Sequence, residues 1–592
     1  MASQEDQSAY ISGLLAAMGF SKKEVNIRRL KWKFLEYTDN LFRRYSIDIE
    51  GFVHSGSSSE GMSGGPYYSG EKSDYDTMKI LKELQVAKDG NDTISKKDAS
   101  MDKYGVLLQE LPDKDYPGYV KLAIIRAAPR FLQIMPERDG RYYLPNTYVN
   151  LETIVQHKMR DFLTNTDPAI RANPVEMSGI HGPAVSLKAS EPKKIRKNLL
   201  TMLQSIGDRN SDLDRAKILM SNSYSDIDIV ACVKSYGWPE EAQNWISRRR
   251  PGSWPDKHTV EYIVENTHVF LAPVGNKSSP DMNLQWRPSF NVAEKLLIES
   301  FNSTQIQCYA LLKIFLKDRL QYIAKDILSS YCMKTTVFWM SEIQGTNNMC
   351  PSKLLYYFAE CLKLLRTWLN EGRLPHYFIE SRNILRSDLD SDELSRLILS
   401  LDEAISNPVL AFEDCKSFSR AVSTAGGDFM IFHQLSARSM LAAWLEMRCG
   451  IIERIHFHGA NCLLCEPYDE YSTGECIERY RRIVDDTRNI AYGDPLLMIL
   501  KSFLGFLCFA KNCGENEIMG QKPYLNETED LLISGKDGDQ ALCPLKLATF
   551  YLKQNKMLDV LQITNVVLKN EETIENRFNF MENLYSKMYE HF

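Results

Sequence analysis

The hydrophobic pattern of the chain changes character near residue 290. Before that point, short stretches such as 119–125, 141–149 and 224–233 alternate apolar and polar residues, which predicts strands with one face toward a core. After it, apolar residues recur every three to four positions, which predicts helices. The predicted helices cover 294–301, 305–320, 327–341 and 352–369. Strands followed by helices predict an α+β fold.

A helical pattern also fills residues 22–46, near the start of the chain. Several basic residues, Arg28 and Arg29 among them, stand between its apolar positions. Such a row of charges is either a solvated helix surface or a surface that contacts the phosphates of nucleic acid. Both alternatives stay open at this point.

The clearest chemical signal lies in residues 54–80, HSGSSSEGMSGGPYYSGEKSDYDTMKI. A stretch rich in Gly and Ser runs into Asp74 and Asp76, whose side chains share a face if 73–80 is a strand. Neighbouring carboxylates repel unless a cation lies between them, and Mg²⁺ prefers such oxygen ligands together with phosphate. Gly/Ser backbone can approach a triphosphate closely. The pattern therefore predicts a nucleotidyltransferase site. The alternative is a solvated loop, in which similar residues also occur.

A second acidic strand would complete a metal site. In residues 224–233, Asp226 and Asp228 share one face of the predicted strand, and the rest of the strand is apolar. Three carboxylates on two strands can hold two metal ions that neutralise charge during phosphoryl transfer. The alternation alone does not choose between Asp226 and Asp228.

Eight short motifs follow one another along the chain. They are SGSSSEGM (55–62), SDYDTM (73–78), GPAVSL (182–187), DIDIVACV (226–233), GWP (237–239), LAPVG (271–275), WRPSFNVAEK (286–295) and SSYCMKT (329–335). In this order they resemble the cyclic GMP-AMP synthase-like receptors of the male-abnormal (Mab) family, which are animal nucleotidyltransferases. The resemblance covers about residues 50–400.

The resemblance implies a bilobal nucleotidyltransferase fold, in which a mixed β-sheet lobe with a spine helix is joined to a helical lobe. It implies that Asp74, Asp76 and Asp228 are the catalytic and metal-binding carboxylates. The residues that it implies for nucleotide binding are Gly56, Ser57, Ser58, Arg287, Glu294, Lys313, Ser330 and Tyr331. We accordingly expect an N-terminal region with the spine helix (1–48), a catalytic lobe (49–290), a helical lobe (291–405) and a helical C-terminal extension (406–592).

The chain departs from the family pattern at residues 188–223, an apparent insertion that is rich in basic residues and precedes the third carboxylate. This insertion and a later run of three arginines are further candidates for nucleic-acid contact, and a solvated surface is the alternative for both. The nucleic-acid candidates are Arg28, Arg29, Lys193, Lys194, Arg196, Lys197, Arg248, Arg249 and Arg250.

The zinc chemistry of the family is a second departure. The vertebrate DNA sensor carries a His/Cys zinc-binding insertion after the WR-containing segment, whereas residues 294–308 run on here without one. The resemblance therefore favours double-stranded RNA over DNA as the activating ligand. One other cluster has usable C-x2-C spacing but otherwise irregular gaps, so we do not expect zinc there. Its residues are His456, His458, Cys462 and Cys465.

The composition of the chain indicates the cellular compartment in which the protein works. The 592 residues carry a formal net charge of −6, so the basic segments are local features. Thirteen scattered cysteines indicate free thiols in a reducing compartment. The opening MASQEDQSAY lacks the pattern of a signal peptide, and the apolar window 496–510 is too short to span a bilayer. We expect a cytoplasmic protein that does not contact membranes.

The residue pattern predicts a nucleotidyltransferase that uses Mg²⁺ or Mn²⁺. The resemblance implies that nucleic acid activates it and that it makes a cyclic dinucleotide of the cyclic GMP-AMP type from ATP and GTP in innate immune sensing, with a downstream cyclic-dinucleotide receptor for the product. One alternative is a catalytically silent scaffold that binds nucleotides or RNA. Another is an enzyme that adds nucleotides to an RNA end. Whether the chain forms a homodimer stays open.

Overall fold

The computed structural model describes most of the chain up to residue 426. The described residues are 3–43, 49–70, 74–87, 105–149, 175–181, 184–189, 227–323, 327–347, 349–385, 390–412, 415–426 and short stretches between 431 and 563. The chain divides into two compact units, Met1–Glu36 with Ser46–Cys449, and Tyr37–Tyr45 with Gly450–Phe592. The described helix of the second unit is α19 (Lys522–Gly535). No helix in the described part of the chain is both long and apolar enough to cross a membrane.

The first unit begins with two helices. α1 (Gln4–Ala17) starts with a capping box, in which Ser3 and Asp6 each accept a hydrogen bond from the other's backbone amide. The helix predicted from residue 22 is present as α2 (Lys22–Arg43). Its Trp32 stacks on Tyr75 of the sheet, while Arg29 reaches the backbone of α10 (Asn291–Glu299). The first part of α2 therefore contacts both lobes, as expected of a spine helix.

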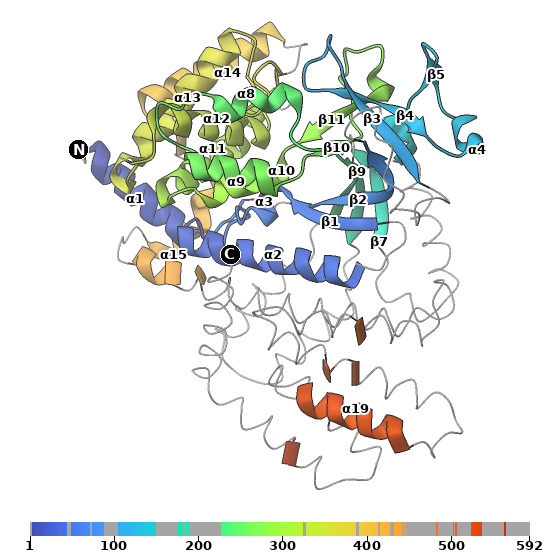
Figure 1. Cartoon of the computed structure of the whole chain (residues 1–592). Coiled ribbons are helices and arrows are strands. Elements are labelled where there is room, and N and C mark those ends of the chain that lie inside the picture. The colour runs from blue at the N-terminus through green and yellow to red at the C-terminus, as the bar shows by residue number, and fades with distance from the viewer. Residues whose placement is uncertain are drawn as a thin grey trace. The chain divides into compact units, whose positions relative to one another are not determined.

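A nine-stranded sheet forms one side of this unit (Figure 1). Its order is β1-β2-β3-β4-β11-β10-β9-β8-β7, and β2 also pairs with β9. The strands are β1 (Ile49–Ser55), β2 (Tyr75–Val86), β3 (Val106–Pro112), β4 (Val120–Arg126), β7 (Val175–His181), β8 (Ala184–Ala189), β9 (Ile227–Lys234), β10 (Phe270–Ala272) and β11 (Gln285–Ser289). The first half of β2 runs parallel to β9 and its end runs parallel to β3. The sheet is therefore mixed, as predicted.

The strand predicted over 141–149 is wrong beyond its first residues. Only Arg141–Tyr142 is a strand (β6), which forms a small separate hairpin with β5 (Glu137–Arg138). Residues 146–149 are helical instead. Pro145 explains the change, because it has no amide hydrogen to continue a ladder and its fixed φ suits the start of a helix.

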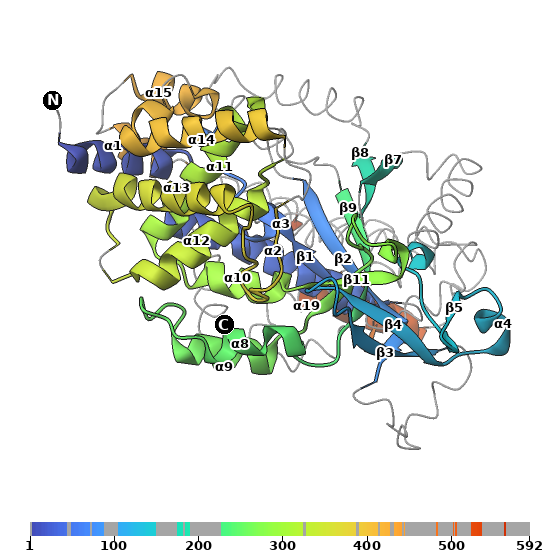
Figure 2. The same ribbon diagram turned by 90° about the horizontal axis from the view of Figure 1, so that it is seen from above.

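Helices form the other side of the first unit (Figures 1 and 2). They are α8 (Gln243–Ser247), α9 (Lys257–Asn266), α10, α11 (Ser303–Asp318), α12 (Ser330–Gln344), α13 (Leu354–Asn370), α14 (Ser391–Ser406) and α15 (Ser419–Ala425). The four helices predicted between 294 and 369 are confirmed as α10 to α13. α11 packs against α1, α12 and α13, and is buried along nearly its whole length. A helix that is apolar on all sides belongs in such a core.

Candidate active site

Two of the predicted carboxylates lie side by side at the start of neighbouring strands. Asp76 on β2 is paired directly with Asp228 on β9 in the parallel register, and Ser55 of β1 lies on the other side of Asp76. Paired residues of adjacent strands project from the same face, so both carboxylates point to one region. Asp74 lies one residue before β2 and is exposed. Asp226 lies outside the described residues.

The carboxylates influence one another strongly. Burial and then the charges of Asp228, Asp74 and Glu60 together raise the pKa of Asp76 from 3.8 to about 7, although Lys334 opposes them. Asp76 thus sits in a concentration of negative charge that disfavours its own ionised form. A cation bound at this position would relieve the repulsion.

The first residues of the Gly/Ser stretch form one helical turn, α3 (Gly56–Ser59). Gly56 has φ of +72°, and a Cβ on it would lie 1.8 Å from Oδ2 of Asp76. Only glycine allows the backbone to approach the carboxylate this closely. The hydroxyl of Ser58 donates to the backbone carbonyl of Asp74 at 3.2 Å, which ties the turn to the acidic segment.

Lys313 connects α11 to the same turn. Its Nζ donates to the hydroxyl of Ser57 at 2.8 Å and to the carbonyl of Met62 at 3.1 Å. Burial lowers the pKa of Lys313 from 10.5 to about 7. A phosphate beside this amine would favour its charged form, so the position suits a phosphate contact.

A buried ion network continues from α3 into the helical lobe. Nζ of Lys334 lies 2.6 Å from Glu60 Oε1 and 2.6 Å from Glu294 Oε2. Burial alone would lower the pKa of Lys334, but the carboxylates of Glu294 and Glu60 hold it well above 10.5. Lys334 therefore stays charged and joins the turn after α3 to α10 and α12.

Tyr331 and His376 extend the network. Nδ1 of His376 accepts hydrogen bonds from the amides of Phe378 and Ile379, at 3.2 and 3.0 Å. The ring proton of His376 is therefore on Nε2, which donates to the Tyr331 hydroxyl at 2.8 Å, and that hydroxyl donates to Glu294 at 3.1 Å. Burial lowers the pKa of His376 well below 6.5, in agreement with a neutral ring.

The other implied nucleotide residues lie near this network. Arg287 is half-buried on β11, where it pairs with Ala272 of β10. Ser330 is exposed at the first residue of α12, next to Tyr331. Hydrogen bonds thus join two pairs of the implied residues, Ser57 with Lys313 and Glu294 with Tyr331.

Comparison with known proteins agrees with this architecture. The Mab-21 protein nucleotidyltransferase domain matches residues 84–300, and the Mab-21 protein HhH/H2TH-like domain matches residues 304–403. Together the two matches cover more than half of the chain. The chain belongs to the Mab-21 family.

One relative of this Mab-21 protein carries a functional name. A "Cyclic GMP-AMP synthase-like receptor" from Magallana gigas is 25% identical over 277 residues, which cover 46% of this chain and 41% of the relative. The match thus spans less than half of the relative's length. Asp228 and Lys313 lie within the two family matches, whereas Gly56, Asp74 and Asp76 precede them.

The carboxylates of the site fit Mg²⁺ by their chemistry. Asp74, Asp76 and Asp228 offer hard carboxylate oxygens, and the raised pKa of Asp76 reflects its burial and then neighbouring negative charge, which a cation would neutralise. Among the described residues, no three His, Cys, Asp or Glu side chains are gathered closely enough to form a metal site on their own. A bound triphosphate would supply oxygens of its own, because Mg²⁺ sites of this class combine one or two carboxylates with substrate phosphates.

Four of the proposed nucleic-acid contacts have structural partners instead. Arg28 is 4% exposed and Arg29 5%, and both donate to backbone carbonyls, of Gly61 and Ile298. They are therefore not on an exposed basic face. Arg248 and Arg250 both pair with the buried Glu342. These four arginines are therefore no longer candidates for an exposed nucleic-acid contact.

Arg248, in the run of three arginines, makes contacts within the protein. Its guanidinium donates to Glu342 at 2.9 Å and to the carbonyl of Tyr377 at 3.0 Å, and it stacks over the ring of Trp339. These contacts hold the segment after α8 against the helical lobe. Arg249, between these two partly buried arginines, is exposed and stays a candidate. The candidates Lys193, Lys194, Arg196 and Lys197, and the cluster His456, His458, Cys462 and Cys465, lie outside the described residues.

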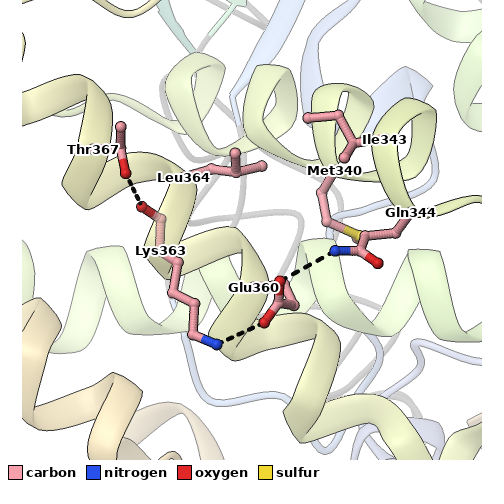
Figure 3. Close-up of a pocket in the computed structure, with 7 residues that line it drawn as sticks. All are labelled: Met340, Ile343, Gln344, Glu360, Lys363, Leu364 and Thr367. Atoms are coloured by element: carbon pink, nitrogen blue, oxygen red, sulfur yellow. Dashed lines mark hydrogen bonds and ion pairs between the residues drawn. The ribbon is translucent and has the colours of Figure 1, made fainter. Parts of the chain in front are cut away.

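A small surface cavity of about 120 Å³ lies away from this site, between α12 and α13 (Figure 3). It is lined by Met340, Ile343, Gln344, Glu360, Lys363, Leu364 and Thr367. Its polar groups are already paired, since Glu360 accepts from both Lys363 and Gln344. None of the candidate site residues lines it.

Three residues of the network, Glu60, Lys334 and His376, were not among the residues expected from the sequence. Two of them lie inside motifs that the sequence offered, Glu60 in SGSSSEGM and Lys334 in SSYCMKT. Each of these motifs holds one charged residue among small or apolar ones, and the two charges are of opposite sign. This pattern could have indicated a buried ion pair. His376 follows α13 in a segment with no comparable signal.

Proposed function

We propose that this Mab-21 protein is a nucleic-acid-activated nucleotidyltransferase that joins ATP and GTP into a cyclic dinucleotide in innate immune sensing. The observation that carries the proposal is the direct pairing of Asp76 with Asp228, with the backbone of Gly56 packed against the Asp76 carboxylate. The name of the Magallana gigas relative supports the class of product. A cytoplasmic setting belongs to the same proposal.

The carboxylates of Asp74, Asp76 and Asp228 would hold Mg²⁺ or Mn²⁺, which supplies charge neutralisation and lowers the pKa of an attacking ribose hydroxyl. The backbone of α3 and the side chains of Ser57 and Lys313 would position the triphosphate of the donor nucleotide. Lys313 becomes fully charged beside the phosphates. The ring of Tyr331 would support a base, because aromatic faces stack on any base.

The chemistry is a nucleotidyl transfer. The hydroxyl oxygen of one nucleotide forms a bond to the α-phosphorus of the other, and the bond from that phosphorus to the oxygen bridging to the β-phosphate breaks. Pyrophosphate leaves, and the hydroxyl proton passes to solvent. A second transfer in the opposite direction closes the ring and releases a second pyrophosphate.

Double-stranded RNA is the proposed activator. In the structure, α10 ends at Glu299 and α11 begins at Ser303, so the connection has no room for a zinc-binding insertion of the kind found in the vertebrate DNA sensor. Recognition of RNA duplexes relies on shape and on phosphate contacts. Exposed basic residues such as Arg249 would contribute.

Product analysis tests the proposal. The purified chain is incubated with radiolabelled ATP, GTP, CTP and UTP and with Mg²⁺ or Mn²⁺, with or without double-stranded RNA or DNA. We expect a small phosphatase-resistant product that requires ATP, GTP and double-stranded RNA. Long products would instead indicate addition to RNA ends. Absence of any product under every condition, with RNA binding retained, would support a silent scaffold.

A further inference from the structure

The loop that follows α3 is held near its far end by a segment from outside both family matches. The loop comprises residues 61–70 and the segment residues 415–420, whereas the second family match ends at residue 403. The amide of Ser69 donates to the carbonyl of Ser417 at 3.3 Å, and the Ser69 hydroxyl donates to the same carbonyl at 3.0 Å and to that of Lys416. Arg420 donates to the carbonyl of Pro66 at 2.9 Å. Two stretches that are far apart in the sequence are therefore joined by several hydrogen bonds.

A single helix, α11, anchors both the loop and this segment. Lys313 of α11 binds the carbonyl of Met62 at the beginning of the loop. Asp318, the last residue of α11, accepts from the amide of Ser417 at 2.9 Å and from the Ser417 hydroxyl at 3.1 Å. The helix dipole disfavours a carboxylate at this end of a helix, and the two hydrogen bonds offset that cost. α11 thus fixes the beginning of the loop directly and its end through Ser417.

Other elements hold the loop between these two points. Arg28 of α2 donates to the carbonyl of Gly61 at 2.9 Å, and the amide of Gly65 donates to the carbonyl of Met18 at 2.7 Å. A Cβ on Gly65 would lie 2.3 Å from the hydroxyl oxygen of Ser439, so glycine permits this close approach. The loop is therefore packed along its length, and a shift at one end is transmitted to the other.

The beginning of the loop moves together with α3. The amide of Met62 donates to the carbonyl of Ser57 at 2.8 Å, and the amide of Glu60 donates to the carbonyl of Gly56 at 3.2 Å. These bonds join the loop to the helical turn whose backbone and Ser57 hydroxyl are the proposed contacts of the donor triphosphate. The position of α3 thus depends on where the loop is held.

We propose that Ser69 and Asp318 are positioning residues that, through Ser417, hold α3 in the place where it binds the donor triphosphate. We call the contacts of these three residues the loop clamp. The inference rests on the proposed function, because it takes α3 and Lys313 as the triphosphate contacts. Time that the loop spends in other positions lowers the apparent affinity for the nucleotide in proportion. The loop clamp therefore acts on nucleotide binding and leaves the chemical step unchanged.

Calorimetry with the full chain, Mg²⁺ and an ATP analogue tests the loop clamp. The analogue carries a methylene group between the α- and β-phosphorus atoms, so it binds without being transferred. We expect Ser69→Ala to raise its Kd about fivefold and Asp318→Ala about tenfold, because they remove one and two hydrogen bonds. Ser69→Thr keeps the hydroxyl and should bind like wild type. Ser423→Ala is the matched control, because this exposed serine donates to the carbonyl of Arg420 within α15.

Steady-state kinetics separate positioning from a general loosening of the fold. In the product assay, the KM for ATP should rise by the same factors as the Kd, while kcat stays within about twofold of wild type. The double variant Ser69→Ala/Asp318→Ala should raise KM by less than the product of the two single factors, because both residues act through Ser417. Melting temperatures of all variants show whether the fold is retained.

Three results would overturn the loop clamp. They are an unchanged Kd for the analogue in the double variant, a fall in kcat with unchanged KM, and single effects that simply multiply. These outcomes are distinct from failure of the proposed function. A chain that makes no product but binds the analogue more weakly in the Ser69 and Asp318 variants keeps the loop clamp and loses the function. A double variant that makes product with unchanged KM keeps the function and loses the loop clamp. A wild-type chain that binds no analogue would overturn both.

Discussion

Replacing Lys334 with methionine removes the shared partner of two buried carboxylates. The side chain of Lys334 is 10% exposed, and those of Glu60 and Glu294 are 3% and 7% exposed. Methionine has a similar length and no charge, so it fills the space without neutralising either carboxylate. Both would then be buried without their counter-ion.

The expected cost follows from this geometry. Removing one partner of a buried ion pair destabilises proteins by about 3–5 kcal/mol, because the remaining charge stays desolvated. We expect Lys334→Met to lose about this amount at pH 8. The loss should shrink toward pH 5. The stranded glutamates have raised pKa values in the folded variant, so they take up protons there before the unfolded chain does.

Urea unfolding at pH 8 and pH 5, followed by tryptophan fluorescence, measures the loss. Lys363→Met is the matched control, because Lys363 is 55% exposed and pairs only at the surface with Glu360. The control should change stability by less than about 1 kcal/mol. Combining Lys334→Met with Glu60→Gln and Glu294→Gln should restore most of the stability. The reasoning is refuted if Lys334→Met unfolds like the control at pH 8, or if the glutamine substitutions make it worse.

Three further predictions concern single positions. Gly56→Ala should lower product formation about 100-fold or more by displacing the aspartate of β2, whereas Gly140→Ala, with a similar φ of +70° and open space, should retain activity. Lys313→Met should be more stable than wild type at pH 7 and lose that advantage toward pH 10. The pKa of Lys313 in the folded protein is lowered to about 7, so burying its charge costs stability at pH 7, and this cost disappears as the unfolded chain also loses the proton. Urea unfolding of both proteins from pH 7 to pH 10 checks this prediction. A difference in stability that stays constant over this range would contradict it. Arg248→Met should lose about 3 kcal/mol in urea unfolding, at the lower end for a broken buried ion pair, because Arg250 still pairs with Glu342. Arg249→Ala should keep its stability and bind double-stranded RNA more weakly in a filter-binding assay.

Much of the fold was visible in the sequence because it depends on local periodicity. Each of the helices α10 to α13, and each of the strands that carry Asp76 and Asp228, buries one or more of its faces. The spacing of apolar residues in the sequence follows from this burial. The strand predicted over 141–149 failed at Pro145, where backbone chemistry outweighs the apolar pattern.

The site was less predictable because its members come from distant segments. Lys334 and Glu60 are 274 residues apart in the chain, and no local pattern connects them. Arg28 and Arg248 resemble surface charges in the sequence, yet Arg28 is buried, Arg248 is partly buried, and both donate to acceptors of the same chain. A charged residue in an amphipathic stretch does not reveal whether its partner is water, nucleic acid or another part of the same chain.

The central claim is that the paired aspartates of β2 and β9 perform nucleotidyl transfer. Pyrophosphate release from ATP and GTP, with Mg²⁺ and double-stranded RNA, tests it most directly when wild type is compared with Asp76→Asn and with the exposed control Asp115→Asn. The account predicts RNA-dependent release by wild type and Asp115→Asn, and none above background by Asp76→Asn. Equal release by all three proteins, or none from a folded wild type that binds ATP and RNA, would contradict it.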